Sequence, residues 1–470
     1  MAAVLLLLIW VQPTTAQLVT TLAGGGPSGQ ESGFQDGVGT AALFWGPGDA
    51  AISSANGKVY VCDSENNVLR AVSLDGSVTT IAGGGPGAPG SQDGVGTAAG
   101  LYGPFGAATS PTWDGVYFSD RNNNKLRFCE PASGSACQVR TAVGGGASGS
   151  QGGSADGVGT AALFYEPNGV AITTSGSIFV TDSGNNKIRF ILFQSGTFTV
   201  STLAGGGAGG TDPGSSDGLG TAALFSAPYA VACDAAGAYA YVADSSNNKV
   251  RVIEAASGVV TTLAGGGASG NLSGATDGFG TAALFRGPEG IALDEVGGVL
   301  YVADVANNKL RAVTLAGDVT TLAGGGEGGT APGSTDGYGT AALFAGPYGV
   351  SIGGGMLYVA DYSNNKIRVV VLPTPSASPS PSPSFSPTAT PTLTPTPSAN
   401  PSGTRQQPPT AAAPASAAPA IAGACVGALA LAGAAFALGV RVGRGGAQRQ
   451  GQGAASKIDA APLLFAALGE

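Results

Sequence analysis

An all-β fold, built as a six-bladed β-propeller, is predicted by three features of the 470-residue sequence. The phrase Thr-Leu-Ala-Gly-Gly-Gly, or a near copy, recurs six times at intervals of 59 to 62 residues. Each interval holds four segments that are rich in β-branched residues and bounded by Gly, Asn and Asp, which is the pattern of short strands. A four-stranded unit repeated six times is typical of propeller blades, whose radial repetition protects the sheet edges.

The two ends of the repeat array are complementary. The sixth unit stops near Leu372 without a fourth strand, and an isolated fourth strand with the sequence Leu-Val-Thr-Thr-Leu-Ala-Gly begins at Leu18. We expect this N-terminal strand to complete the sixth blade and to close a ring formed by residues 17–372.

The segments outside the repeats predict a membrane-anchored protein. Residues 1–16 have the short apolar run and small residues of a signal peptide, with a buried first strand as the alternative. Residues 373–419 are rich in Pro, Ser and Thr and predict a disordered, extended stalk of up to about 145 Å.

Residues 420–440 are uncharged and span about 31 Å as a helix, enough for one transmembrane helix. A soluble low-complexity helix is the alternative for this segment. The arginines of residues 441–470 predict a cytoplasmic tail. We therefore expect a single-pass plasma-membrane protein with an extracellular propeller; a secreted or cell-wall protein is the alternative.

The composition excludes several kinds of chemistry. The chain contains no histidine, which rules out histidine general bases, His-containing triads and imidazole-ligated zinc. Its net charge of -9 is opposite to the basic field that attracts phosphate backbones. Nucleic acid is therefore not an expected partner.

Cysteine spacing and one sequon suggest secretory modifications. Cys129 and Cys137 flank a predicted hairpin turn and are candidates for one cross-strand disulfide. Cys62 and Cys233 lie in apolar strand patterns and are expected to be buried thiols. Asn271, in Asn-Leu-Ser, is a candidate N-glycosylation site.

Every unit repeats an Asp, an Asn-Asn three and four residues later, and an Arg at the seventh position. If Asn-Asn forms a two-residue turn, the Asp and the Arg face each other across two strands as structural ion pairs. Ligand binding is the alternative role. The pairs are Asp63 and Arg70, Asp120 and Arg127, Asp182 and Arg189, Asp244 and Arg251, Asp304 and Arg311, and Asp361 and Arg368.

A second Asp opens the phrase Asp-Gly-x-Gly-Thr in every unit. Calcium needs about six to eight oxygen ligands, and one carboxylate per loop is too few, so we expect each Asp to cap its own turn. We therefore expect no cofactor, with calcium as the alternative. These residues are Asp36, Asp93, Asp156, Asp217, Asp277 and Asp336.

The phrases Gly-Pro-Tyr-Gly-Val-Ser-Ile, Leu-Tyr-Val-Ala-Asp-Tyr-Ser-Asn-Asn-Lys-Ile-Arg and Val-Thr-Thr-Leu-Ala-Gly-Gly resemble NHL-repeat proteins over residues 18–372. The resemblance implies a six-bladed propeller that acts chiefly as a binding platform, in some members on extracellular membrane proteins. Amidating lyases with this propeller hold zinc through histidines, which this chain lacks. RNA-binding members use a basic face, and this chain is acidic.

The residues around the Pro that starts each first strand differ between the repeats. In a propeller the first strands line the central channel, so we expect these side chains to ring its mouth and to bind a protein, peptide or glycan. Plugging of the channel is the alternative role, and a calcium-dependent hydrolase or lactonase is the alternative to a non-catalytic binding or scaffold module. The residues are Trp45, Phe105, Tyr165, Glu166, Asn168, Tyr229, Arg286, Glu289 and Tyr348.

Overall fold

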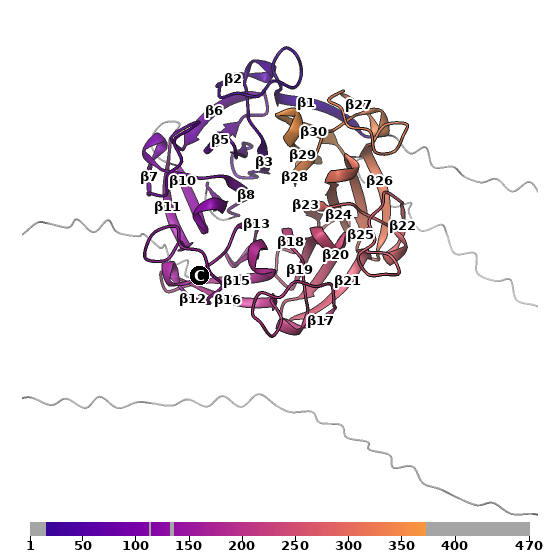
Figure 1. Cartoon of the computed structure of the whole chain (residues 1–470). Helices are drawn as coiled ribbons and strands as arrows, with labels where there is room; N and C mark the ends of the chain where they lie inside the picture. The colour runs from indigo at the N-terminus through magenta and orange to yellow at the C-terminus, as the bar shows by residue number, and fades with distance from the viewer. Residues whose placement is uncertain (1–15, 112–113, 132–135, 373–470) are drawn as a thin grey trace, which may run out of the picture. The chain divides into compact units, whose positions relative to one another are not determined.

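A computed structural model describes residues 16–111, 114–131 and 136–372 and places them in a closed ring of six antiparallel sheets (Figure 1). The signal peptide predicted for residues 1–16 falls almost wholly outside these residues, and the stalk, transmembrane helix and tail predicted for residues 373–470 fall wholly outside them. Within the described ranges, none of the helices has the length and hydropathy of a membrane span.

Four strands of each blade follow the repeat pattern. The first strand begins at the repeated Pro and lies at the centre of the ring in Figure 1: β3 (Pro47–Ile52), β8 (Pro104–Thr109), β13 (Pro167–Ile172), β18 (Pro228–Cys233), β23 (Pro288–Asp294) and β28 (Pro347–Gly353). The second strand ends at the repeated Asp: β4 (Val59–Asp63), β9 (Val116–Asp120), β14 (Ile178–Asp182), β19 (Tyr239–Asp244), β24 (Val299–Asp304) and β29 (Met356–Asp361).

The third and fourth strands complete these four. The third strand carries the repeated Arg: β5 (Val68–Val72), β10 (Lys125–Pro131), β15 (Lys187–Gln194), β20 (Lys249–Glu254), β25 (Lys309–Thr314) and β30 (Lys366–Val371). The fourth strand leads into the Gly-rich loop: β6 (Ser77–Ala82), β11 (Cys137–Gly144), β16 (Thr197–Gly205), β21 (Val259–Gly265), β26 (Asp318–Gly324) and, for the sixth blade, β1 (Leu18–Gly24).

Each sheet has a fifth strand that the sequence analysis did not predict. The Asp-Gly phrase pairs with the fourth strand at the rim, in β2 (Gly37–Val38), β7 (Gly94–Val95), β12 (Gly157–Val158), β17 (Gly218–Leu219), β22 (Gly278–Phe279) and β27 (Gly337–Tyr338). A short 3₁₀ helix follows in each case: η1 (Gly39–Ala41), η2 (Gly96–Ala98), η4 (Gly159–Ala161), η6 (Gly220–Ala222), η8 (Gly280–Ala282) and η10 (Gly339–Ala341). These two-residue strands end each sheet with a very short edge, which limits pairing with other chains.

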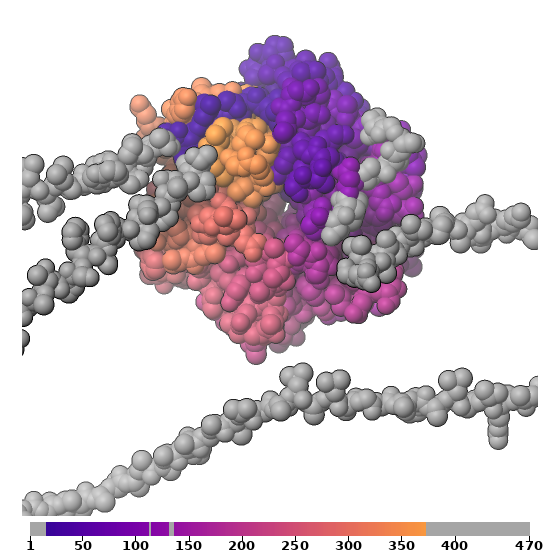
Figure 2. Space-filling view, turned by 180° about the vertical axis from the view of Figure 1, so that it is seen from behind, coloured from indigo at the N-terminus to yellow at the C-terminus, as the bar shows by residue number. Residues whose placement is uncertain are grey.

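The N-terminal strand closes the ring as predicted. β1 lies between β30 and β27, with Val19 opposite Val370, and the indigo start of the ring runs beside its orange end in Figures 1 and 2. A buried apolar cluster joins the two ends and includes Phe44 of the first blade and Tyr358 of the sixth. Five similar clusters fill the other blade junctions, so the hydrophobic core is distributed between the blades.

The predicted register of the Asn-Asn hairpin is wrong. Asp63 is paired with Val68, and Arg70 is paired with Val61, because four residues separate the strands where two were expected. In five blades this turn is a 3₁₀ helix: η3 (Arg121–Asn123), η5 (Ser183–Asn185), η7 (Ser245–Asn247), η9 (Val305–Asn307) and η11 (Tyr362–Asn364). The shift moves the partner of the Arg by two residues, which keeps the Asp and the Arg on the same face of the sheet.

Each Arg connects two carboxylates. Arg70 Nη1 lies 2.8 Å from Asp63, and its Nη2 lies 2.8 Å from Asp36 of the Asp-Gly phrase. Asp36 also accepts hydrogen bonds from the backbone and hydroxyl of Thr80, so it does not cap its own turn as expected. The five other blades repeat both ion pairs through fully buried arginines: Arg127, Arg189, Arg251, Arg311 and Arg368.

The second Asn of each hairpin joins neighbouring blades. Asn67 has a left-handed backbone, with φ at 57°, and its Oδ1 accepts a hydrogen bond from the Gly103 backbone of the second blade at 2.8 Å. Asn365 does the same for Gly46 at 3.0 Å, across the closure of the ring. Four equivalent hydrogen bonds are accepted by the side-chain oxygens of Asn124, Asn186, Asn248 and Asn308.

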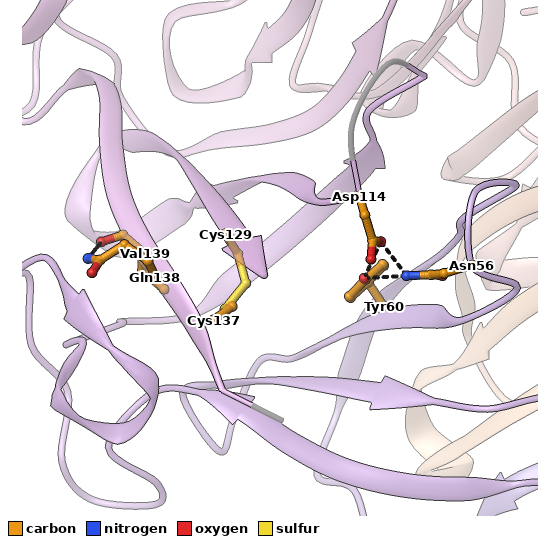
Figure 3. The surroundings of a disulfide bond; sticks show 7 residues. All are labelled: Asn56, Tyr60, Asp114, Cys129, Cys137, Gln138 and Val139. Atoms are coloured by element: carbon orange, nitrogen blue, oxygen red, sulfur yellow. Dashed lines mark hydrogen bonds between the residues drawn. A yellow bond between two sulfur atoms is a disulfide. The ribbon is translucent and has the colours of Figure 1, made fainter. Parts of the chain in front are cut away.

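The disulfide connects the third and fourth strands of the second blade. Figure 3 shows the bond between Cys129 and Cys137, whose Cα atoms lie 5.6 Å apart. A separate contact in Figure 3 joins the first two blades, because Asp114 accepts hydrogen bonds from Asn56 and Tyr60 of the first blade. Cys62 is a buried thiol, whereas Cys233 is only half-buried.

Removal of one buried arginine should destabilise the ring. Arg127→Met leaves the buried Asp120 carboxylate without its cation, which should cost on the order of 3–5 kcal/mol in the free energy of unfolding. The matched control is Arg140→Met in the same blade, where an exposed ion pair with Glu130 contributes about 0–1 kcal/mol. Denaturant titration of both variants measures the difference, and equal losses would contradict the role of the buried Arg.

Candidate functional site

The inner strands converge so closely that they need small residues. A Cβ atom added to Gly106 would clash with the Asn168 carbonyl of the next blade, and one added to Gly290 would clash with the Tyr348 carbonyl. The second residue after the repeated Pro is Gly in four blades and Ala230 in a fifth. The centre of the ring, hollowed in Figure 2, is therefore a narrow channel of about 230 Å³.

Three aromatic rings fill the mouth of this channel. Phe105, Tyr229 and Tyr348 come from the second, fourth and sixth blades, and their ring centroids lie 5.3 to 5.9 Å apart in edge-to-face contacts. Such contacts stabilise aromatic pairs beyond simple burial. For these three residues the plugging role describes the structure better than direct ligand binding does.

Two polar residues complete the channel mouth. Burial raises the pKa of Glu289 to about 8, because the charge of Arg121 and the hydrogen bond from Tyr229 offset it only in part. Glu289 is therefore mostly protonated at pH 7. Asn168 donates to Ser183 Oγ at 2.9 Å and is almost fully buried. Glu289 Oε2 and Asn168 Oδ1 have no hydrogen-bond partner among the described residues, so one carboxyl oxygen and one amide oxygen remain unpaired at the channel mouth.

Asp49 is a channel residue that the sequence analysis missed. The first blade has Gly48-Asp49 after its Pro, where the other blades have a larger residue followed by Gly or Ala. Burial raises the pKa of Asp49 to about 6, although backbone hydrogen bonds from Ala50 and Ala107 to the carboxylate lower it in part. Both carboxylate oxygens accept one of these bonds, so Asp49 joins the first two blades. The reversed order of Gly and the polar residue was the signal in the sequence.

The other predicted mouth residues lie outside the channel. Trp45 and Tyr165 have nearly half of their side-chain surface exposed, and Arg286 is also exposed. Their position two residues before the Pro is fixed by a backbone N–H that donates to the Asp at the end of the second strand. Glu166 lies at a blade junction and accepts a hydrogen bond from Arg121 Nη2 at 2.9 Å. None of these four residues lines the channel itself, and a ligand-binding role for them stays a prediction.

Two adjoining pockets lie beside the channel mouth, over the sixth, first and second blades. We call the first, of about 510 Å³, the acidic pocket; its lining consists of Ser32, Trp45, Gly46, Glu65, Tyr362, Ser363 and Asn365. We call the second, of about 450 Å³, the arginine pocket; its lining consists of Ser64, Glu65, Asn67, Tyr102, Gly103, Phe105, Arg121, Asn122 and Tyr362. Glu65 and Tyr362 line both, and Phe105 connects the arginine pocket to the channel.

The residues of these pockets come largely from two positions that the sequence analysis did not examine. Between the Asp and the Asn-Asn of each hairpin, the first, second and sixth blades carry Ser64-Glu65, Arg121-Asn122 and Tyr362-Ser363. The other three blades carry only small residues there. The polar and aromatic side chains thus gather on one half of the ring, and the differences within an otherwise repeated phrase were the available signal.

Packing fixes the central side chains of the pockets. Tyr362 donates to Glu65 Oε1 at 2.8 Å, and its ring lies 4.5 Å from that of Tyr348. Burial raises the pKa of Tyr362, and its bond to Glu65 adds to this effect, so the phenol stays protonated as a donor. The guanidinium of Arg121 lies 5.7 Å from the centre of the Phe105 ring. These contacts preorganise the pocket walls.

The Asp-Gly carboxylates do not converge on a calcium site. Each is bound to its own Arg and Thr at the rim of a different blade, as Asp36 and Asp336 illustrate. Across the part of the chain that the structure describes, no three Cys, Asp or Glu side chains lie close enough together to hold a metal ion. Asn271 is exposed in a Gly-rich loop, where its side chain is accessible.

Comparison with known proteins agrees with the repeat pattern. The family model described as NHL repeat matches residues 164–189, from Phe164 to the buried Arg189 of the third blade. NHL repeat-containing protein 2 of Gallus gallus is 28% identical over 336 residues, which cover 65% of this chain and 43% of that protein. Protein SUPPRESSOR OF QUENCHING 1, chloroplastic, of Arabidopsis thaliana is 30% identical over 302 residues, which cover 62% of this chain and 27% of that protein.

Solved structures share the fold. A structural genomics protein and an auxiliary nutrient binding protein, both from Bacteroides thetaiotaomicron, match with TM-scores of 0.55 at 22% and 16% sequence identity. Each match covers 76% of this chain and 76% of the other.

The ring of six sheets is a six-bladed β-propeller, and the NHL-repeat match in the third blade and the NHL repeat-containing relatives confirm the predicted resemblance to NHL-repeat proteins. This chain is similar to NHL repeat-containing protein 2 but spans less than half the length of the curated relatives it matches. The membrane-anchored arrangement stays a prediction.

The buried acid at the channel mouth predicts a pH-dependent stability. Because the folded protein raises the pKa of Glu289 from 4.5 to about 8, the stability that its neutral form confers is present below about pH 4.5 and is lost as the pH rises through 8. Glu289→Gln stays neutral, so it should be more stable than the parent at pH 9 by on the order of 3 kcal/mol and similar at pH 5. Thermal melts at both pH values measure this, with exposed Glu327→Gln as the control. Equal pH profiles for parent and Glu289→Gln would refute the assignment.

Proposed function

We propose that the chain is a non-catalytic recognition or scaffold module of the cell surface, and that its propeller binds a protein, peptide or glycan in the two pockets beside the channel. The observation that carries this proposal is the concentration of half-exposed aromatic and charged side chains on one half of an otherwise repeated ring. The fold does not require them, since three blades form the same turns with small residues. Aromatic walls with a few fixed polar groups are typical of binding sites.

The arrangement favours binding over catalysis. A hydrolase needs a nucleophile or an activated water beside a base, or several oxygens around a metal. Asp49 is occupied by two backbone N–H groups, and Glu289 is mostly protonated at pH 7 and lies against the aromatic plug. A calcium-dependent hydrolase thus has no ligand set among the described residues to support it. We propose that binding needs no cofactor and no nucleic acid.

The disulfide supports the secretory route. Disulfides form and persist in oxidising compartments and are rare in the cytosol. The Cys129–Cys137 bond, the exposed Asn271 and the segment pattern of residues 1–16 all fit an extracellular propeller. The signal peptide of residues 1–16 and the anchoring by residues 420–440 are inferred from the sequence pattern.

Loss of the pocket aromatics should abolish binding. The full-length protein is screened on a glycan array and a peptide array, and any ligand found is retested on a Trp45→Ala, Tyr362→Ala double variant. We expect at least a tenfold loss of affinity, since these rings form the walls of the acidic pocket. The control is Tyr239→Ala, an exposed Tyr at the start of β19 that lines neither pocket. Binding that survives the double variant would exclude these pockets as the site.

The cellular location has its own test. A tag is placed at the C-terminus, and intact cells are treated with an external protease. We expect the propeller to be cleaved or shaved from the cells and the tag to remain protected inside, since the arginines after residue 440 predict a cytoplasmic tail. A propeller that is protected until the cells are lysed would contradict the surface location.

A further inference from the structure

The acidic pocket combines one carboxylate with two aromatic rings. Glu65 is the charged residue of its lining, and its side chain is exposed beside the rings of Trp45 and Tyr362. Trp45 has 48% of its surface accessible, so its ring is available to a ligand. Tyr362 cannot swing away easily, because its hydroxyl is bound to Glu65 and its ring stacks against Tyr348.

This combination is suited to a cation. The faces of Trp and Tyr rings carry negative charge density and attract ammonium and guanidinium groups, most strongly at Trp. A carboxylate at the edge of the same pocket adds a charge-assisted hydrogen bond. The net charge of -9 also favours the approach of a positively charged partner.

The arginine pocket shares Glu65 with the acidic pocket but adds hydrogen-bond donors of its own. Arg121 uses Nη2 to bind Glu166, and about a third of its side chain is exposed to the pocket. Asn122 is exposed beside it, and its side-chain amide supplies a second hydrogen-bond donor. These groups donate hydrogen bonds, so this end of the site is suited to carbonyl or carboxylate oxygens.

We infer that the ligand is a protein segment that places a Lys or Arg side chain in the acidic pocket and a backbone carbonyl or carboxylate in the arginine pocket. This inference rests on the proposed function and names its ligand class. A peptide carries both a cationic side chain and a hydrogen-bond acceptor a few ångströms apart. The cation can lie in the acidic pocket while the acceptor lies in the adjoining arginine pocket. A neutral sugar would form only ordinary hydrogen bonds with Glu65, and its binding would carry the energetic cost of desolvating the Glu65 carboxylate.

The test compares a charged peptide with a neutral one of the same shape. The probes are blocked Gly-Ser-Gly-Arg-Gly-Ser-Gly, its Lys counterpart, and the same peptide with citrulline, the uncharged analogue of Arg. Each is titrated into the full-length protein by calorimetry or by ligand-observed NMR. We expect the Arg and Lys peptides to bind about tenfold more tightly than the citrulline peptide.

The variants assign this preference to a residue. Glu65→Gln should reduce the preference to about twofold or less and leave the melting temperature unchanged, because Glu65 lies at the surface. The matched control is exposed Glu327→Gln, which should keep the full preference. Arg121→Met should weaken all three peptides alike, because it removes the donor for the acceptor group.

Several results would overturn the inference. They are equal binding of the citrulline peptide, an unchanged preference in Glu65→Gln, or no peptide binding up to millimolar concentration. If a neutral oligosaccharide then binds and the Trp45→Ala, Tyr362→Ala variant loses it, the proposed binding function stands and only the ligand class is wrong. If array ligands bind that double variant as well as they bind the parent, both proposals fail.

Discussion

The fold depends on one repeated interaction, a fully buried arginine that connects two carboxylates from different parts of the unit. Arg70 joins Asp63, at the end of the second strand, to Asp36, in the phrase that crosses the rim. Burial raises the pKa of Asp63 to about 6 even though Arg70 opposes this, so the pair is costly to bury and very costly to break. The same guanidinium restrains the path of the loop, because Asp36 is bound to Nη2 while Asp63 occupies Nη1.

That constraint explains which parts of the sequence repeat and which vary. The Asp, the Asn-Asn, the Arg and the Asp-Gly phrase are all joined by side-chain hydrogen bonds, so a change at one leaves a buried partner unsatisfied. The two residues between Asp and Asn-Asn form the repeated hydrogen bonds of the turn through their backbone, whereas their side-chain contacts change from blade to blade. They are free to differ, and the candidate site is built from them.

The fold was largely predictable from the sequence, because a period of about 60 residues and the orphan strand at Leu18 leave little choice of architecture. Two details were not. The predicted hairpin register was wrong because Asn-Asn is also compatible with a four-residue turn, in which only the second Asn, such as Asn67 or Asn124, adopts positive φ. The fifth strand was not predicted because a strand of two residues is too short to show an alternation of apolar and polar side chains.

The site was predictable only in part. Phe105, Tyr229 and Tyr348 were located at the channel by the position of the Pro, but their packing into a plug depends on how far inner strands converge. Glu65, Arg121 and Tyr362 were missed because they come from three different blades and meet only after closure of the ring. These residues are far apart in the sequence and become neighbours only in the circular fold.

The geometry of the acidic pocket depends on this closure. Tyr362 belongs to the sixth blade, which β1 completes, and Trp45 and Glu65 belong to the first. Gln30 crosses this seam, since its side chain donates to Asn364 at 2.8 Å and its carbonyl accepts from Asn365. An open ring would separate Tyr362 from Glu65 and dissolve the pocket. The first and the last blade are not linked through the chain at this seam, and the side chains of the acidic pocket lie beside it. The hydrogen bonds that hold the seam together therefore also hold the candidate site together.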